Sequence, residues 1–263
     1  MSDRNWFPRV SQQRIIGLTG GVGMGKTTVS NYLASAHHLP VLDADIYARD
    51  AVQPGEPVLQ EIIERYGPVL LLPDGHLDRM RLGEVVFNNP SERIWLEQRI
   101  HPYVRHRITT TLANLAGQSP IVVVVIPLLF EARMTDLVNE IWVVRCPLEQ
   151  QIERLMQREV EGSHLNRQQA QTRIDSQMEI ERKVQRADVV IENASNLEAL
   201  YRQVDAALHH PAAVQSSHPK VGHEVGHRVE PSDRPHGTTQ AIASIPTNPI
   251  ASGHAPASWQ QFA

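Results

Sequence analysis

The chain has 263 residues, a formal net charge of −4 at pH 7 and a single cysteine, Cys146. The nearly balanced charge argues against a general nucleic-acid binder and against electrostatic attachment to a membrane. One cysteine excludes an intrachain disulfide framework and a cysteine-rich metal site, and the length suits one α/β domain with additional segments.

The N-terminal extension, residues 1–13, lacks the continuous apolar stretch of a secretory signal. The longest apolar run, residues 121–130, is too short to span a bilayer and is interrupted by Pro127. We therefore expect a cytoplasmic protein without membrane association, and no obligate protein partner is evident from the sequence.

Residues 20–27 match the phosphate-binding pattern G-x-x-x-x-G-K-T, between a strand predicted at Ile15–Thr19 and a helix predicted at Lys26–Ser35. Glycines let the backbone curl so that several N–H groups face one anion, and the helix adds its positive N-terminal end. Lys26 can reach the β- and γ-phosphates, and the Thr27 hydroxyl can ligate Mg²⁺. A chance glycine-rich turn is the weaker alternative. The expected nucleotide-binding residues are Gly21, Val22, Gly23, Met24, Gly25, Lys26, Thr27 and Thr28.

The next strand is predicted at Val41–Asp43 and ends in two aspartates, Asp43 and Asp45. In a parallel sheet the carboxyl ends of the strands line one crevice, so Asp43 should share a rim with the phosphate loop. A carboxylate there can orient an acceptor hydroxyl and accept its proton. Either aspartate can instead cap the helix that begins near Ile46, and the two roles can coexist.

A mainly helical insertion is expected at residues 53–111, with helices at Pro57–Tyr66 and Ser91–Thr111 and Ser91 as a possible N-cap. In a small-molecule kinase such an insertion closes over the acceptor. Arg79 and His101 are therefore candidates for acceptor binding, with structural hydrogen bonds as the alternative role.

The third strand, predicted at Ile121–Ile126, ends before Pro127, and Leu128 is placed in an acceptor pocket. Glu131 either faces that pocket or caps a helix. Many proteins with this loop carry a magnesium-orienting aspartate on this strand, but residues 122–125 are all valine. Asp43 then serves more than one purpose, or water completes the metal shell.

A basic helical lid is expected at about residues 150–186, after a strand at Glu140–Arg145, with helices at Leu148–Arg158 and Arg167–Arg186. Arg154 and Arg158 are four residues apart on one helix face, and arginine donates two parallel hydrogen bonds to phosphate. Both are expected to act in catalysis. The alternative is a solvated charged surface, since acidic residues are interspersed.

A last strand at Val189–Glu192 and a helix at Leu197–Leu208 close the predicted body, residues 14–208. Strands that alternate with helices favour an α/β fold with a parallel five-stranded sheet covered on both faces. Residues 209–263 are rich in proline, histidine and small polar residues, which predicts a disordered tail.

Together these segments resemble the dephospho-coenzyme A kinases, a family of P-loop small-molecule kinases. The resemblance covers about residues 15–208. The residues that carry it are Gly17–Lys26, Asp43–Asp45, Ala48–Arg49, Leu77–Arg79, Leu82–Gly83, Val86–Phe87, His101–Pro102, Pro127–Glu131, Arg154–Arg158, Arg173, Gln177, Lys183, Ala187–Asp188, Ile191 and Asn193.

The resemblance implies ATP-dependent phosphorylation of the ribose 3′-hydroxyl of dephospho-coenzyme A, the final step of coenzyme A synthesis, with ATP and Mg²⁺ as co-substrate and metal. It implies a nucleotide core, a helical acceptor region and a lid. It makes Asp43 the candidate base at the ribose hydroxyl. The tail departs from the family, whose members usually stop near Leu208.

Two other functions remain open from the sequence. The first is a different small-molecule kinase, acting on a nucleoside monophosphate or a sugar acid. The second is a nucleotide-dependent switch, although the guanine-reading N-K-x-D pattern of GTPases is absent from the chain.

Overall fold

The computed structural model describes residues 13–209, apart from residues 88, 158 and 161–162. A five-stranded sheet in the order β2-β3-β1-β4-β7 forms its centre, and every pair of neighbouring strands is parallel. The expected parallel sheet is thus confirmed. Its strands are β1 Arg14–Gly20, β2 Val41–Asp43, β3 Ile121–Val125, β4 Glu140–Arg145 and β7 Val189–Glu192.

Helices occupy the connections between these strands, except that between β3 and β4, and a further helix follows β7. They are α1 Lys26–His37, α2 Ala44–Asp50, α3 Pro57–Tyr66, α4 Arg79–Phe87, α5 Pro90–Leu115, α6 Leu148–Gln157, α7 Arg167–Asp175, α8 Ile180–Val184 and α9 Leu197–His209. Two 3₁₀ turns, Pro68–Leu70 and Thr135–Leu137, and a small antiparallel pair, β5 Glu159–Val160 with β6 Ser163–His164, complete the described elements.

The two faces of the sheet carry different helices because successive strand side chains point to opposite sides. On β3, Val123 and Val125 pack in one core cluster with residues of α1 and α9. Val122 and Val124 pack in the other cluster, with residues of α2 and α5. All four valines are buried, which accounts for the uninterrupted apolar run.

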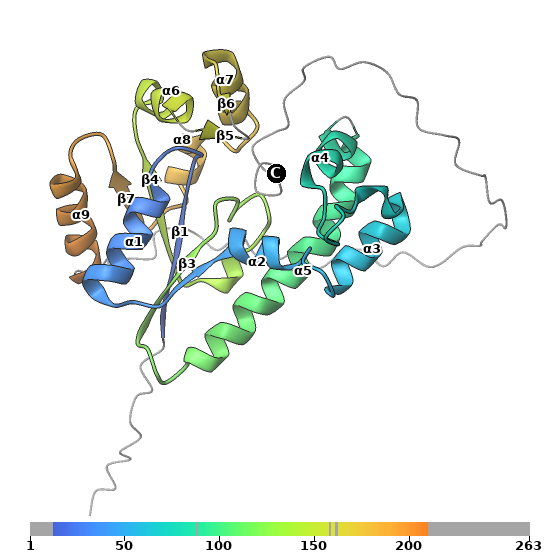
Figure 1. The fold of residues 1–263 in the computed structure, drawn as a ribbon. Coiled ribbons are helices and arrows are strands. Elements are labelled where there is room, and N and C mark those ends of the chain that lie inside the picture. Colours follow the sequence, from blue (N-terminus) through green and yellow to red (C-terminus); the bar gives the residue numbers. More distant parts are fainter. Residues whose placement is uncertain (1–12, 88, 158, 161–162, 210–263) are drawn as a thin grey trace, which may run out of the picture. The chain divides into compact units, whose positions relative to one another are not determined.

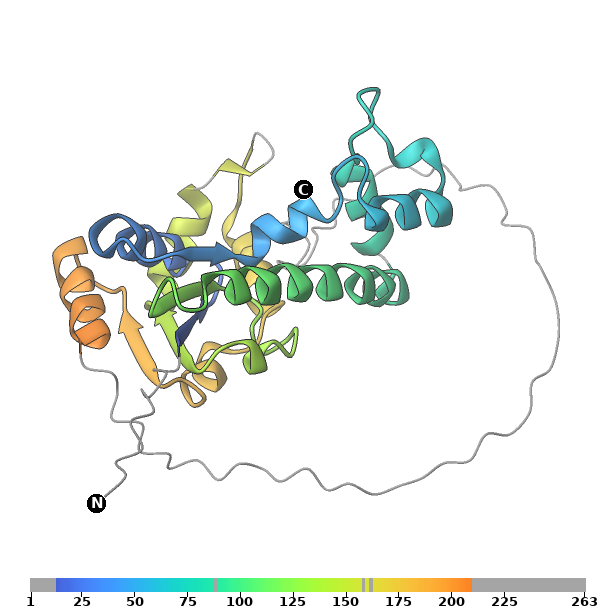
Figure 2. The ribbon, with the colours of Figure 1, turned by 90° about the horizontal axis from the view of Figure 1, so that it is seen from below.

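Helix α5 connects the sheet to the helical segment between β2 and β3. Figure 2 shows α5 running from one face of the sheet out to α3 and α4. Its buried residues recur at helical spacing, from Leu96 through Val104 to Leu112. Its N-cap is Asn89, whose side chain accepts the backbone N–H of Ser91, so the expected cap at Ser91 is wrong. Asparagine supplies the same acceptor oxygen two residues earlier.

The expected continuous helix at residues 167–186 is also wrong. Helix α7 ends at Asp175, and α8 begins at Ile180. Between them, the backbone N–H of Met178 donates to Glu131 Oε1 at 3.1 Å rather than to a carbonyl one turn earlier. Glu131 thus fixes the segment that precedes α8, a distant contact that helical periodicity does not report.

No helix of the described residues is long and apolar enough to cross a membrane. The expected N-terminal extension, residues 1–13, lies almost entirely outside the described residues, as does the tail after His209. The predicted divisions of the chain into core, insertion, lid and tail stay predictions.

Candidate active site

The phosphate loop joins β1 to α1 at the carboxyl edge of the sheet. Gly20, Gly23 and Gly25 have φ values of 144°, 74° and 97°, a region that disfavours residues with a side chain. The Lys26 ammonium group folds back over the loop and donates to the carbonyls of Gly20 and Gly21 at 3.0 and 2.9 Å. These bonds hold the ammonium group close to the backbone of the loop.

Asp43 and Asp45 lie at the end of β2, on the same sheet edge as the loop. Asp43 Oδ1 accepts the backbone N–H of Asp45 at 2.8 Å, which makes Asp43 the N-cap of α2. A carboxylate has a second oxygen, so this cap is compatible with a role at an acceptor hydroxyl. Of the two capping candidates in the sequence, Asp43 holds the cap.

The electrostatics of Asp45 connect the aspartates to the loop. Burial and the neighbouring Asp43 carboxylate raise the pKa of Asp45 to about 6, while the positive charges of Lys26 and Arg49 act in the opposite direction. Lys26 therefore acts electrostatically on Asp45. The loop follows β1 and the aspartates follow β2, and although β3 lies between these two strands, their carboxyl ends meet at one edge of the parallel sheet.

A second group of cations lies on α2 and α4. The pKa of Arg79 is lowered by burial and by the positive charge of Arg49. Two guanidinium groups near one another in a partly buried place favour an anion between or beside them. Burial lowers the pKa of His101, which favours the neutral imidazole, and the charge of Glu97 acts in the opposite direction.

The expected lid residues fall into different environments. Arg154 donates from Nη2 to the carbonyl of Asn193 at 3.0 Å, and its buried Nη1 has no hydrogen-bond partner within the described part of the chain. Arg167 and Arg182 form exposed ion pairs with Glu149 and Glu179, which favours the solvated alternative for these two. Arg158 lies outside the described residues.

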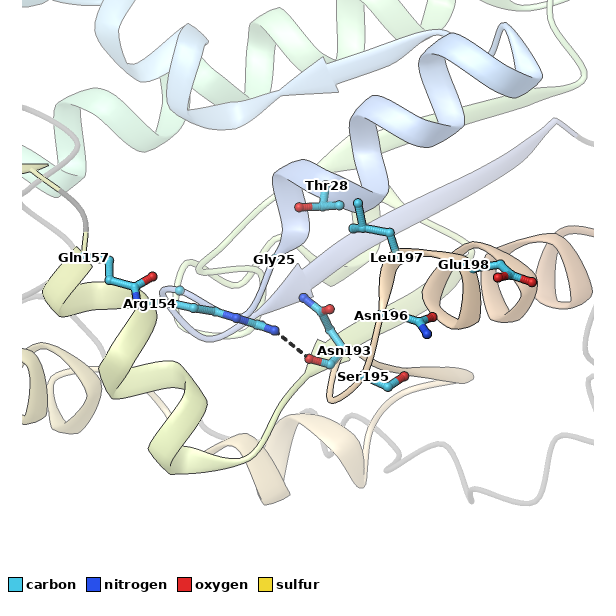
Figure 3. A pocket seen from close by; sticks show the side chains of 10 residues that line it. Gly25, Thr28, Arg154, Gln157, Asn193, Ser195, Asn196, Leu197 and Glu198 are labelled. Carbon is cyan, nitrogen blue, oxygen red and sulfur yellow. Dashed lines mark hydrogen bonds between the residues drawn. The ribbon is translucent and has the colours of Figure 1, made fainter.

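A cavity of about 880 Å³ opens beside the loop (Figure 3). Side chains reach it from α1, α6 and the connection between β7 and α9. Sequence reasoning gave no site role to most of its polar residues. Asn193 directly follows strand β7, at the carboxyl edge of the sheet. This position could have identified it as a candidate site residue from the sequence. The lining residues are Gly23, Gly25, Thr28, Arg154, Gln157, Asn193, Ser195, Asn196, Leu197 and Glu198.

Comparison with known proteins identifies the family and the fold. A model of the dephospho-CoA kinase family matches residues 14–199, which include the loop, the aspartate pair and the cavity. The chain belongs to the dephospho-CoA kinase family. The resemblance seen in the sequence is thereby confirmed.

Individual members of the dephospho-CoA kinase family agree with this assignment. The chain is 59% identical over 196 residues to the dephospho-CoA kinase of Trichormus variabilis, covering 74% of this chain and 97% of the relative. Identity to the dephospho-CoA kinase of a Nostoc species is 58% over the same length, with the same coverage.

Solved structures give the same result for the fold. A crystal structure of TT1252 from Thermus thermophilus has a TM-score of 0.63 and 36% identity, covering 75% of this chain and 97% of that one. The dephospho-CoA kinase from Campylobacter jejuni has a TM-score of 0.57 and 27% identity, covering 75% and 96%. The P-loop kinase fold expected from the sequence is confirmed.

A magnesium ion, which the phosphate loop led us to expect, would fit the oxygen chemistry of the site. Thr27 offers a hydroxyl in the first turn of α1, and Asp43 and Asp45 offer carboxylates nearby. Hydroxyl, carboxylate and water oxygens are the ligands that Mg²⁺ prefers, and it commonly keeps several waters. Within the described residues no cluster of three histidine, cysteine, aspartate or glutamate side chains forms a dedicated metal site.

Proposed function

We propose that this member of the dephospho-CoA kinase family transfers the γ-phosphoryl group of ATP to the ribose 3′-hydroxyl of dephospho-coenzyme A. The proximity of a phosphate-binding loop and an aspartate pair is the observation that carries this proposal. The charge of Lys26 partly opposes the raised pKa of Asp45, which neighbours Asp43, so donor and acceptor chemistry meet at one place.

ATP is proposed to lie along the loop with its nucleoside in the 880 Å³ cavity. Residues 21–28 surround the phosphates, and α1 directs its N-terminal end toward them. Leu197, which is 56% exposed and lines the cavity, offers an apolar contact for a flat base. The unpartnered Nη1 of Arg154 within the described chain offers a donor to the phosphates.

Asp43 is proposed to orient the ribose hydroxyl and to accept its proton as phosphoryl transfer proceeds. Its Oδ1 holds the N–H of Asp45, which fixes the orientation of the carboxylate. Lys26 neutralises charge that develops on the transferred group. Mg²⁺ would be held by Thr27 and by water and carboxylate oxygens, and it would supply further positive charge at the phosphates.

The acceptor is proposed to contact Arg79, Asp45 and Leu128, with Arg79 and its neighbour Arg49 meeting the diphosphate of dephospho-coenzyme A. The positive charge of Arg49 at Arg79 supports this placement. His101 is proposed as a neutral hydrogen-bonding group rather than a cation, because burial lowers its pKa. Arg158 is proposed to act beside Arg154 in the lid, on the basis of its sequence position alone. We also propose that the protein is located in the cytoplasm.

The test is an assay of the purified chain with ATP, Mg²⁺ and dephospho-coenzyme A, followed by location of the new phosphate by nuclear magnetic resonance. We expect a 3′-phosphate on the ribose. AMP, gluconate and shikimate serve as competing acceptors. Phosphorylation of one of these in preference to dephospho-coenzyme A would favour another small-molecule kinase, and acceptor-independent ATP hydrolysis would favour a switch.

A further inference from the structure

Two glutamines from distant parts of the chain hold the backbone of Val22 in the middle of the phosphate loop. Gln177 Oε1 accepts the N–H of Val22 at 2.9 Å. Gln151 Nε2 donates to the carbonyl of Val22 at 2.8 Å. Gln151 lies on α6, and Gln177 lies between α7 and α8. Neither position belongs to the phosphate-binding pattern.

The two bonds fix two successive peptide planes, because the N–H and the carbonyl of one residue belong to different peptide units. In a trans peptide the next N–H points opposite to the carbonyl. With the carbonyl of Val22 turned toward Gln151, the N–H of Gly23 points to the opposite side. Gly23 lines the nucleotide cavity, so this N–H is available to an anion there.

Asn193 repeats the arrangement two residues later in the loop. Its Nδ2 donates to the carbonyl of Met24 at 2.9 Å, which directs the N–H of Gly25 away from Asn193. A Cβ atom at Gly25 would lie 2.1 Å from Asn193 Nδ2. Glycine at position 25 is therefore required by the close approach of this amide as well as by its positive φ.

Gln177 is itself held in place by an ion pair between a buried lysine and a partly exposed glutamate. The next residue, Met178, donates its N–H to Glu131, whose Oε1 also pairs with Lys183 Nζ at 2.8 Å. Lys183 is fully buried and donates to the carbonyl of Pro127 as well. The segment that carries Gln177 is thus anchored to the connection that follows β3, on the acceptor side.

We propose that Gln151, Gln177 and Asn193 form an amide brace that directs the N–H groups of Gly23 and Gly25 toward the nucleotide phosphates. All three are positioning residues, since they act through the loop and not on the substrate. The brace turns carbonyl oxygens outward, where they do not repel the triphosphate. This inference rests on the proposed binding of ATP at the loop, and not on the identity of the acceptor.

The experiment measures binding of ATP and of adenosine to the full chain at pH 8 by calorimetry, with no acceptor present. Gln177→Leu removes the acceptor of the Val22 N–H, and we expect the dissociation constant for ATP to rise about 3- to 10-fold. Adenosine carries no phosphate, so its affinity should stay within about twofold. Equal losses for ATP and adenosine, or no loss for ATP, would overturn the brace.

Glutamate substitutions give a sharper readout because the two glutamines have opposite hydrogen-bonding roles. In Gln177→Glu a carboxylate still accepts the N–H of Val22, so ATP affinity should be retained. In Gln151→Glu the carboxylate cannot donate to the Val22 carbonyl, and affinity should fall at least as far as in Gln151→Leu. A purely structural role predicts no such asymmetry, and equal effects would contradict the proposal.

Gln171 supplies the matched control. It lies on α7 and lines a cavity of about 710 Å³ together with Gln151 and Gln177, but its amide donates to Asp175. Gln171→Glu adds the same charge near the loop, and Gln171→Leu removes a comparable amide. Both should bind ATP like the unmodified chain.

If Gln177→Leu fails to fold, the comparison of Gln177→Glu with Gln171→Glu decides the question. Failure to phosphorylate dephospho-coenzyme A would refute the acceptor assignment without affecting this binding test.

Discussion

The donor and acceptor sides of the active site are constructed differently. The donor side consists of consecutive backbone groups at residues 20–28, fixed by Lys26 and by three amide side chains. The acceptor side consists of side chains from separate elements, such as Asp43 at the end of β2 and Arg79 at the start of α4. A binding site made of local backbone is rigid and general, whereas one made of distant side chains can be specific. Substitutions on the two sides should therefore change different kinetic parameters.

Lys26→Ala should have the largest effect, because it removes both the phosphate-binding charge and the bonds to Gly20 and Gly21. We expect kcat to fall by about 10³-fold with any acceptor. Steady-state kinetics and thermal unfolding would separate catalysis from folding. Arg202→Ala, which removes an exposed cation paired with Glu198, is the control and should retain full activity. Comparable loss in both variants would refute the role of Lys26.

Asp43→Asn should lower kcat by about 10²-fold while the dissociation constant for ATP changes little. The amide oxygen of asparagine still accepts the Asp45 N–H, so the cap of α2 is retained. Asp205→Asn alters a carboxylate that accepts from Tyr32, away from the loop, and should leave kcat unchanged. If Asp43→Asn weakened ATP binding alone, the carboxylate would belong to the donor side.

Arg79→Ala should raise KM for dephospho-coenzyme A by about tenfold and leave KM for ATP unaltered, since one charged hydrogen bond to the acceptor is lost. The neighbouring Arg81→Ala removes an exposed guanidinium that pairs with Asp78 and should change neither value. Initial rates, measured while the concentration of each substrate is varied in turn, give both KM values for the two variants. A rise in KM for ATP would show that the two sides are not separable at this residue.

Asp45→Asn should have the smallest effect and should appear in stability. The native pKa of Asp45, about 6, lies above the ordinary aspartate value. Stability from this group is therefore present below about pH 4 and is lost as pH rises through about 6. We expect the variant to be more stable than the unmodified chain by roughly 3 kcal/mol at pH 8, with no such gain at pH 4.

Chemical denaturation across this pH range measures the difference. Glu198→Gln, an exposed carboxylate paired with Arg202, should show no comparable pH dependence. A gain in Asp45→Asn that is independent of pH would mean that the carboxylate is not destabilised by burial and by Asp43.

The sequence predicted correctly those features that depend on residues close together in the chain. It failed where a contact joins residues far apart in the chain. The runs that end at Val125 and Arg145 predicted buried parallel strands because burial on both faces leaves a continuous apolar segment. The break between helices α7 and α8 at residues 176–179 was not predicted. Its cause is the hydrogen bond from Met178 to Glu131, a residue far away in the sequence, and local helical periodicity does not report such a contact. The short helix α2 was predicted only by its start near Ile46, two residues after its first residue, and α4 was not predicted individually within the helical insertion.

The candidate site shows the same division. Lys26 and Asp43 could be proposed as site residues from the sequence because a glycine-rich loop and the end of a parallel strand have recognisable positions. Gln151 and Gln177 were not, because a glutamine on a polar helix has no distinctive pattern until its amide meets Val22.

By itself, the sequence determined the phosphate loop, the parallel sheet and the family, since each depends on contiguous residues or on periodicity along the chain. Only the tertiary structure decided that Lys183 is buried against Glu131 and that three amides hold the loop. These contacts join residues far apart in the chain. Their geometry exists only once the sheet has brought the ends of β1, β2, β3 and β7 together.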